Sequence, residues 1–236
     1  MLYLIGLGLN EKSISQEGLE AIKKCKRIYF ENYTVDFPYS VKVLEKNIKK
    51  KVIPAGRDFV ESDKLIKEAK KENICLLIYG SPLTATTHIT LIQEAKKNKI
   101  KYELIYNASI FDAIAETGLQ IYKFGKITSM PKWSNNFKPT SFMEIVKQNN
   151  VIDAHSLILV DIGLESKDAM EELEISAKEH DIKLDKLIIC SRLGTKDSKI
   201  SYKNSENIKN LNVKKPYCII IPSRLHFVEQ EILEKF

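Results

Sequence analysis

An apolar run that stops at a hydroxyl-rich turn is the strongest constraint on how this chain folds. Residues 74–78 (ICLLI) lead through Tyr79 into Gly80-Ser81-Pro82-Leu83-Thr84-Ala85-Thr86-Thr87-His88. An apolar run ending in Gly-Ser-Pro is typical of a buried strand, and we expect a helix to begin near Thr86. Ligands of open α/β sheets bind outside the carboxyl ends of strands. A plain connection needs only one or two polar residues, so this turn is the first candidate for a binding site.

Strand-like and helix-like segments alternate along the whole chain, which predicts an α/β fold. We expect strands at residues 2–5, 27–30, 52–53, 74–78, 102–106, 126–129, 157–162, 187–190 and 218–221. Helices are expected at 18–24, 58–71, 86–95, 111–115, 141–147, 167–180 and 226–236. Either Ser13 or Ser15 opens the first helix, and Ser13 with Gln16 has the spacing of a capping box.

A second polar turn repeats the design of the first one. Asn107-Ala108-Ser109-Ile110 follows the expected strand at 102–106. Because the two turns belong to neighbouring strand–helix units, we expect them to converge on one crevice. No linker is long or rich enough in proline and glycine to separate independent modules. The sequence therefore predicts two abutting α/β lobes, residues 1–112 and 113–236.

Composition excludes several classes of protein. The net charge of +6 is the difference between 37 basic and 31 acidic residues. Only four of the basic residues are arginine, and the lysines are spread along helix faces. Specific nucleic-acid binding usually requires clustered arginines and aromatics, so we expect no such partner. No apolar run reaches the ~18 residues of a membrane span. Without a signal sequence, a cytoplasmic location is expected.

Cofactor and metal motifs are equally sparse. Gly6-Leu7-Gly8 begins like a dinucleotide fingerprint, but Glu11 occupies the third glycine position, and there is no Walker loop. Three of the four cysteines lie in apolar runs, where we expect them in the core. No two histidines have metal-ligand spacing, so no metal is expected.

A few polar residues leave two interpretations open. His88 is either a helix-start hydrogen-bonding residue or a ligand contact. Asp161 is either an acceptor for backbone amides or a member of the site. For His226 we favour a helix cap. Because no acid–base pair stands out, the pattern favours a reaction driven by positioning.

Several stretches together resemble the diphthine synthases, a group within the tetrapyrrole-methylase family. They are residues 1–9 (MLYLIGLGL), 30–34 (FENYT), 80–88 (GSPLTATTH), 107–110 (NASI), 117–125 (TGLQIYKFG), 139–142 (PTSF), 159–162 (LVDI) and 190–194 (CSRLG). The resemblance covers nearly the whole chain, and the motifs are specific in combination.

The resemblance implies a two-lobed α/β fold with S-adenosyl-L-methionine bound in a cleft between the lobes, and a homodimer. The reaction it implies is methylation of the amino group of 2-(3-amino-3-carboxypropyl)histidine on translation elongation factor 2. The product is diphthine, an intermediate of diphthamide biosynthesis, and in the eukaryotic form a methyl ester is added as well. The implied cofactor-binding residues are Leu9, Ser81, Thr84, Ser109, Ile110, Val160, Leu193 and Tyr217; no catalytic residue is assigned.

Three of these positions depart from the family pattern. Ser81 stands where the family usually has aspartate, Tyr217 where it often has histidine, and Leu193 where it often has alanine. Tyr122 and Lys123 are candidates to face the acceptor. The alternatives are a tetrapyrrole methyltransferase of the same family, and a non-catalytic module that binds a translation factor.

Overall fold

The computed structural model describes residues 1–208 and 211–236. The chain forms two compact units, Met1–Asp112 and Ala113–Phe236. Each unit has its own sheet and its own hydrophobic core.

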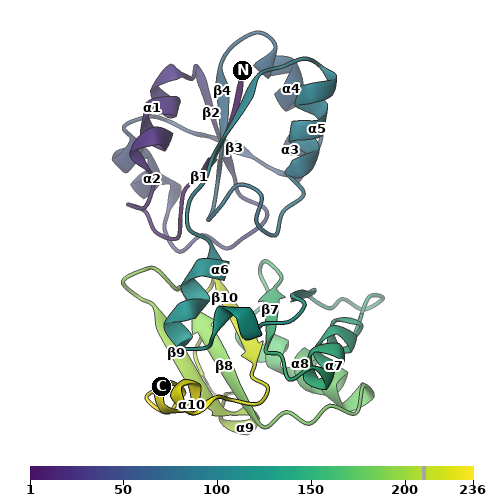
Figure 1. The fold of residues 1–236 in the computed structure, drawn as a ribbon. Coiled ribbons are helices and arrows are strands. Elements are labelled where there is room, and N and C mark those ends of the chain that lie inside the picture. Colours follow the sequence, from purple (N-terminus) through teal and green to yellow (C-terminus); the bar gives the residue numbers. More distant parts are fainter. Residues whose placement is uncertain (209–210) are drawn as a thin grey trace. The chain divides into compact units, whose positions relative to one another are not determined.

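The first unit is a parallel sheet with helices on both faces (Figure 1). Its strands are β1 (Leu2–Gly6), β2 (Arg27–Glu31), β3 (Ile53–Ala55), β4 (Ile74–Ile78) and β5 (Tyr102–Ile105), in the order β3-β2-β4-β1-β5. All four strand pairs are parallel. Its helices are α1 (Gln16–Lys24), α2 (Val41–Ile48), α3 (Arg57–Val60), α4 (Lys64–Ala69), α5 (Ile89–Lys97) and α6 (Ile110–Ala113, which crosses into the second unit).

Alternation along β1 explains the two covered faces. Leu2 and Leu4 pack with the core formed by α4 and α5, whereas Tyr3 and Ile5 pack with the core formed by α1 and α2. Successive side chains of a strand point to opposite faces, so a strand that is apolar at every position must be buried on both. This burial fixes β1 and β4 at the centre of the sheet.

The structure corrects the predicted helix at 58–71. It is two helices, α3 and α4, separated at residues 61–63. The Ser62 hydroxyl donates to the Phe59 carbonyl and accepts from the Lys64 N–H. Such local side-chain bonds compete with the helical ladder and end the helix. Helix α2 was not predicted.

Two helix starts also differ from the prediction. Helix α5 begins at Ile89, not near Thr86, because Ala85 adopts a left-handed φ of 54° and the following residues bond back to Pro82. Helix α1 is capped by Ser15, whose hydroxyl accepts from the Gly18 N–H at 3.0 Å. The capping box from Ser13 is wrong, because the Ser13 hydroxyl instead donates to the Asn10 carbonyl.

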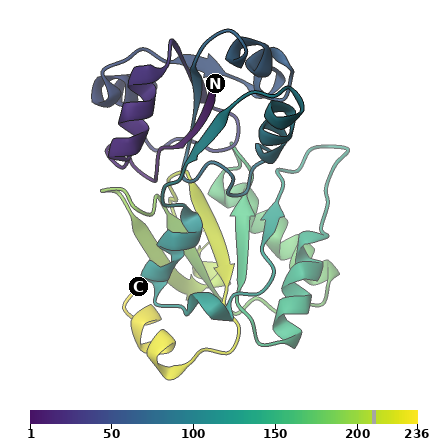
Figure 2. The same ribbon diagram turned by 45° about the horizontal axis from the view of Figure 1, so that its top comes forward.

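The second unit has a mixed sheet in the order β6-β7-β10-β8-β9. The strands are β6 (Thr128–Met130), β7 (Ser156–Val160), β8 (Lys186–Ser191), β9 (Lys199–Asn204) and β10 (Tyr217–Ile221). Strand β10, yellow in Figure 2, lies in the middle and is antiparallel to both neighbours. Helices of this unit are η1 (Ile114–Thr117), η2 (Ile121–Lys123), α7 (Phe142–Val151), α8 (Ser166–Glu179), α9 (Ser205–Ile208) and α10 (Phe227–Leu233).

Strand β9 was missed because it is a polar edge strand. Its sequence, KISYKN, contains only two large apolar residues, and it pairs on one side only, with β8. The apolar strands β7, β8 and β10 were each predicted to within a few residues. As predicted, Cys75, Cys190 and Cys218 are buried in the cores, and Cys25 is buried as well.

Candidate functional site

The first sheet has its topological switch point between β1 and β4. The connection after β1 passes through α1 to β2, and the connection after β4 passes through α5 to β5, on the other side of the sheet. Where neighbouring strands send their connections in opposite directions, a crevice opens at their carboxyl ends. The turns that follow β1 and β4 therefore border the expected ligand position.

Two glycines join these turns through the backbone. The Gly8 N–H donates to the Gly80 carbonyl at 3.1 Å, and the Gly80 N–H donates to the Gly8 carbonyl at 3.0 Å. Both residues have left-handed φ angles, 70° and 68°. At Gly6, a Cβ would lie 2.6 Å from the Gly80 carbonyl oxygen. Only glycine permits this close approach and this backbone conformation together.

Asn107 connects the turn after β5 to the same group. Its Nδ2 donates to the carbonyls of Gly6 at 3.1 Å and Ser13 at 2.8 Å, while its Oδ1 accepts from the Ala108 N–H. Three adjacent strands, β4, β1 and β5, thus end in turns that are hydrogen-bonded or packed together. The convergence that the sequence predicted for the two polar turns is present, since a Cβ built on Gly80 would lie 3.6–3.8 Å from atoms of Ser109 and Ala108.

Most polar groups of these turns stabilise the turns themselves. Ser109 is buried, and its N–H and hydroxyl both donate to Asp112 Oδ2. The Thr84 N–H donates to the Ser81 carbonyl, and Tyr79 Oη donates to the Leu9 carbonyl. Residues 6–10, 80–88 and 106–110 contain no lysine or arginine. The edge is therefore suited to a neutral or cationic ligand rather than to a phosphate.

His88 is buried beside this edge and does not cap helix α5 with its side chain. Nδ1 lies 3.2 Å from the Pro82 carbonyl oxygen, and Nε2 lies 3.5 Å from Tyr33 Oη. Burial lowers the pKa of His88, so the ring is neutral. Burial also raises the pKa of Tyr33, to about 12. The structure therefore places His88 in an internal hydrogen-bonded chain.

Three predicted cofactor residues of the second unit lie at the same end of its sheet, where β7 and β8 finish and β10 begins. Strands β7 and β8 run in the same direction and β10 runs against them. Val160 is the last residue of β7, Tyr217 is the first residue of β10, and Leu193 follows β8 by two residues. Tyr217 Oη donates to the Leu164 carbonyl at 3.1 Å. This edge offers mainly apolar side chains and backbone groups.

Asp161 follows Val160 and is an acceptor for backbone amides. Its carboxylate accepts from the N–H groups of Lys132 at 3.0 Å and Ile162 at 2.9 Å. The loop after β6 is held further by Glu172, which accepts from the Trp133 N–H at 3.0 Å. Burial raises the pKa of Glu172. Of the two interpretations of Asp161, its contacts favour the structural one.

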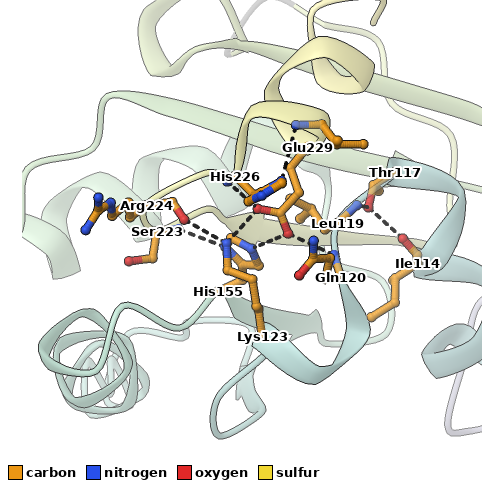
Figure 3. Close-up of polar contacts among 11 residues, drawn as sticks. Ile114, Thr117, Leu119, Gln120, Lys123, His155, Ser223, Arg224, His226 and Glu229 are labelled. Atoms are coloured by element: carbon orange, nitrogen blue, oxygen red, sulfur yellow. Dashed lines mark hydrogen bonds and ion pairs between the residues drawn. The ribbon is translucent and has the colours of Figure 1, made fainter.

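A buried charged network lies at the start of β7 (Figure 3). Glu229 is fully buried and accepts from Lys123 Nζ at 2.6 Å, from the backbone N–H groups of Gln120 and His226, and from His155 Nε2 at 3.3 Å. Burial alone would raise the pKa of Glu229, but these hydrogen bonds outweigh it and lower the pKa to about 2. Because Lys123 Nζ also donates to the Arg224 carbonyl, its ammonium is committed to this network.

Other classes of site find no support in the residues that the structure describes. Among residues 1–208 and 211–236, no three histidine, cysteine or acidic side chains are grouped so that they could hold a metal ion. None of the helices in the same ranges combines the length and apolar composition that a membrane crossing needs.

Comparisons with known proteins decide the family. The model of the tetrapyrrole (corrin/porphyrin) methylases matches residues 1–208. The chain is 32% identical over 270 residues to the diphthine methyl ester synthase of Bos taurus, covering all of this chain and 95% of that protein. The chain belongs to the tetrapyrrole methylase family, and within it to the diphthine synthases.

Two further matches give the extent of the likeness. Diphthine methyl ester synthase of Schizosaccharomyces pombe is 44% identical over 170 residues, which is 71% of this chain but only 60% of the yeast protein. A candidate diphthine synthase of Entamoeba histolytica has a crystal structure that superposes with a TM-score of 0.91 at 33% identity, covering 100% of this chain and 98% of that one. The α/β fold expected from the sequence is thereby confirmed.

In this chain the predicted cofactor residues fall into two groups. Leu9, Ser81, Thr84, Ser109 and Ile110 lie at the carboxyl edge of the first sheet, and Val160, Leu193 and Tyr217 lie at one edge of the second. Sequence reasoning did not single out His155. Its partner Glu229 lies 74 residues away, and no local pattern links the two. His226 does cap α10, as predicted.

Proposed function

We propose that this methylase transfers methyl groups from S-adenosylmethionine to 2-(3-amino-3-carboxypropyl)histidine on translation elongation factor 2, giving diphthine. One structural observation carries the proposal. The backbone bridge between Gly8 and Gly80 brings Leu9, Ser81 and Thr84 to one edge of the sheet. The likeness to diphthine methyl ester synthases over the whole chain supports the choice of substrate.

The residues at each of the two edges, taken separately, suit a part of S-adenosylmethionine. Its sulfonium is a cation, and the three turns at residues 6–10, 80–88 and 106–110 carry no lysine or arginine. The adenosine requires apolar walls, for which Ile110, Val160 and Leu193 are suitable, and hydrogen-bonding groups, which the backbone at Leu9 supplies. The glycines at the switch point leave no side chain between a ligand and the backbone.

This chemistry does not demand a strong protein base. When bound, S-adenosylmethionine would supply an electrophilic methyl group. The acceptor nitrogen would displace the sulfide in line, with the N–C bond forming as the S–C bond breaks and the proton on nitrogen passing to water. A peptide α-amino group has a pKa of roughly 8. The acceptor amine lies beside its own carboxylate, which raises its pKa further, so its neutral fraction near pH 7 is small and desolvation in the site has to favour the neutral form. The protein has to align and desolvate the two partners, which is the kind of catalysis that positioning can provide.

The names of the mammalian and yeast relatives specify a methyl ester. We therefore propose that the chain also methylates the carboxylate of the same side chain. A carboxylate is ionised at pH 7 and reacts as an oxygen nucleophile without losing a proton first. One alignment of the methyl group can serve both acceptors if the side chain turns between them.

A labelling experiment tests the proposal. Elongation factor 2 carrying the aminocarboxypropyl group is incubated with the protein and methyl-labelled S-adenosylmethionine. The mass of the modified peptide of the elongation factor is then measured by mass spectrometry. We expect up to three methyl groups on nitrogen and one that mild alkali removes, as an ester requires. Calorimetric titration with S-adenosylhomocysteine is expected to show binding. Absence of both binding and transfer would overturn the proposal.

The same experiment separates the alternatives. Transfer to a corrinoid or porphyrinogen but not to the elongation factor would indicate a tetrapyrrole methyltransferase. Binding of the elongation factor without any affinity for S-adenosylhomocysteine would indicate a non-catalytic module. We further propose a homodimer in the cytoplasm, on the basis of the family likeness; light scattering and cell fractionation test these two points.

Ser81 is the position that tests the cofactor residues directly. It lacks the carboxylate that the family usually has there, and a charge-assisted hydrogen bond contributes about 1.5–3 kcal/mol. If that carboxylate holds the cofactor in relatives, Ser81→Asp will tighten S-adenosylhomocysteine binding at least tenfold. Unchanged affinity would mean that the contact at this position is made by the backbone.

A further inference from the structure

A chain of hydrogen bonds leads from the end of β2 to the turn that follows β4. Tyr33 Oη lies 3.5 Å from His88 Nε2, and His88 Nδ1 lies 3.2 Å from the carbonyl oxygen of Pro82. The imidazole is only 1% exposed. Pro82 lies between Ser81 and Thr84, the two residues of this turn that we propose for cofactor binding.

The partners fix the tautomer of the ring. A carbonyl oxygen can only accept, so the proton must be on Nδ1. Nε2 then has a lone pair and accepts from the Tyr33 hydroxyl. Both nitrogens of a neutral His88 are thereby used, and the direction of every bond in the chain is set.

The far end of the chain is anchored by a buried carboxylate. Glu31 is fully buried and accepts from the N–H groups of Tyr33 and Thr34 and from the Thr34 hydroxyl, at 2.7–2.8 Å. The Arg57 guanidinium lies 5.3 Å from the centre of the Tyr33 ring. Tyr33 is therefore held on both its backbone and its ring, and it offers His88 a fixed donor.

The near end of the chain sets the shape of the turn. The Pro82 carbonyl accepts from Thr86 Oγ1 at 3.3 Å as well as from His88, and the Thr84 N–H closes the turn on the Ser81 carbonyl. Rotation of the peptide after Pro82 would therefore move Thr84 and disturb its bond to Ser81. The His88 contact opposes that rotation.

We propose that His88 is a positioning residue of the S-adenosylmethionine site, which holds the Pro82 carbonyl through Nδ1–H and so fixes Ser81 and Thr84. This inference rests on the proposed function, because it assigns His88 to the cofactor and not to the acceptor. Loss of the contact weakens cofactor binding and leaves the Michaelis constant for the acceptor unchanged.

Substitution of His88 by asparagine or by glutamine tests the two ring nitrogens separately. In His88→Asn, the amide nitrogen occupies the place of Nδ1 and can still donate to Pro82. In His88→Gln, the amide lies near the place of Nε2 and cannot. A net hydrogen bond is worth about 0.5–1.5 kcal/mol, up to about tenfold in affinity. We expect S-adenosylhomocysteine to bind His88→Asn within about twofold of wild type and His88→Gln about tenfold more weakly.

The controls keep this test separate from the proposed function. His180→Asn changes a partly buried histidine at the C-cap of α8 and should leave binding unchanged. If the wild-type protein does not bind S-adenosylhomocysteine, the proposed function fails. If wild type binds and all folded His88 variants bind equally, or Asn and Gln weaken binding alike, the positioning role is wrong.

A measurement on the wild-type protein guards against variants that do not fold. Nitrogen-15 NMR of the histidine rings should show the His88 proton on Nδ1, and a proton on Nε2 would overturn the inference. Tyr33→Phe keeps the Nδ1 bond and should weaken cofactor binding only about two- to threefold.

Discussion

Two buried histidines, one in each unit, use their rings in opposite ways. His88 donates from Nδ1 to a backbone carbonyl and accepts at Nε2 from a tyrosine hydroxyl. His155 accepts at Nδ1 from the Ser223 N–H at 3.0 Å, so its proton is on Nε2 and points at Glu229. Burial lowers the pKa of both. The same residue type thus carries opposite tautomers because its fixed backbone partners differ.

The difference reflects how each region is built. The turns around His88 are held by backbone hydrogen bonds, glycines and hydroxyl groups, and they leave an uncharged edge for a ligand. The surroundings of His155 are held by charge, with Lys123 and His155 converging on a fully buried Glu229 (Figure 3). We infer that the first region is organised for binding, and that the second is organised to fasten α10 to η2 and β7.

The largest expected effect is the loss of Glu229. Glu229→Leu leaves the Lys123 ammonium without its counter-charge and two backbone N–H groups without their acceptor. Breaking a buried pair in this way costs about 3–5 kcal/mol. Urea unfolding followed by the fluorescence of Trp133, the single tryptophan and part of the second unit, measures the loss. Glu231→Gln, on the exposed side of α10, is the matched control and should change stability by less than about 0.5 kcal/mol.

If the Glu229→Leu protein were as stable as wild type, the surroundings of His155 would not be held together by charge. The charged network would then contribute as little as a surface ion pair.

Acid should weaken the second unit over a defined range. The lowered pKa of His155 means that the unfolded state binds a proton first, so stability falls as pH drops below about 6.5. The pKa of Glu229 is about 2 when folded, against 4.5 for the ordinary group, so its contribution is intact above pH 4.5 and is lost as pH falls towards 2. That contribution is about 3 kcal/mol.

The expected outcome is a free energy of unfolding, followed by Trp133 fluorescence, that drops steeply between pH 4.5 and 2 in wild type. In Glu229→Gln, which cannot titrate, the drop over this range should be smaller by about 3 kcal/mol. A profile that is the same in both proteins would show that Glu229 is not the group responsible.

The sequence predicted the first region better than the second for a physical reason. The turns at Gly80 and Asn107 are local: each is a short polar stretch after an apolar strand, and the parallel sheet brings the two together by rule. The network around Glu229 joins residues 120, 123, 155 and 229, which are brought together only by the fold. No spacing rule identifies such a set in a single sequence.

The predicted helix boundaries were wrong where side chains form hydrogen bonds with the backbone. Ser62 splits the helix expected at 58–71, and Thr86 and His88 both bond back to Pro82, which delays the start of α5. Periodicity alone cannot show these contacts, because the positions of Leu65 and Ile66 suit one long helix as well as a short one. Strand β9 was not predicted because an edge strand needs few apolar residues.

Glycine substitutions should damage the first region, because it is built from backbone. Gly8→Ala places a Cβ 2.6 Å from Ser13 Cβ on a residue with a left-handed φ of 70°. Gly80 has a similar φ of 68°, but its Cβ would meet nothing closer than 3.6 Å. The left-handed backbone costs about 1 kcal/mol in both, and overpacking adds about 1–3 kcal/mol at Gly8 only.

Hydrogen exchange of the β1 and β4 amides measures this pair of variants. We expect Gly8→Ala to lose protection by about 2–4 kcal/mol and Gly80→Ala by about 1 kcal/mol, while Trp133 fluorescence stays unchanged in both. Equal losses would show that the packing around Ser13 yields to the added methyl group.

The smallest expected effect comes from the same pair of substitutions at His155, where the opposite order of stability is expected. Because the proton of His155 is on Nε2, His155→Gln can keep the bond to Glu229, whereas His155→Asn cannot reach it. The difference should be about 1 kcal/mol in favour of the glutamine variant, measured by urea unfolding at pH 7.5, where the wild-type ring is neutral. For His88 the order is reversed, with asparagine better than glutamine. The same preference at both positions would mean that side-chain length, and not the tautomer set by the backbone, decides which substitute is tolerated.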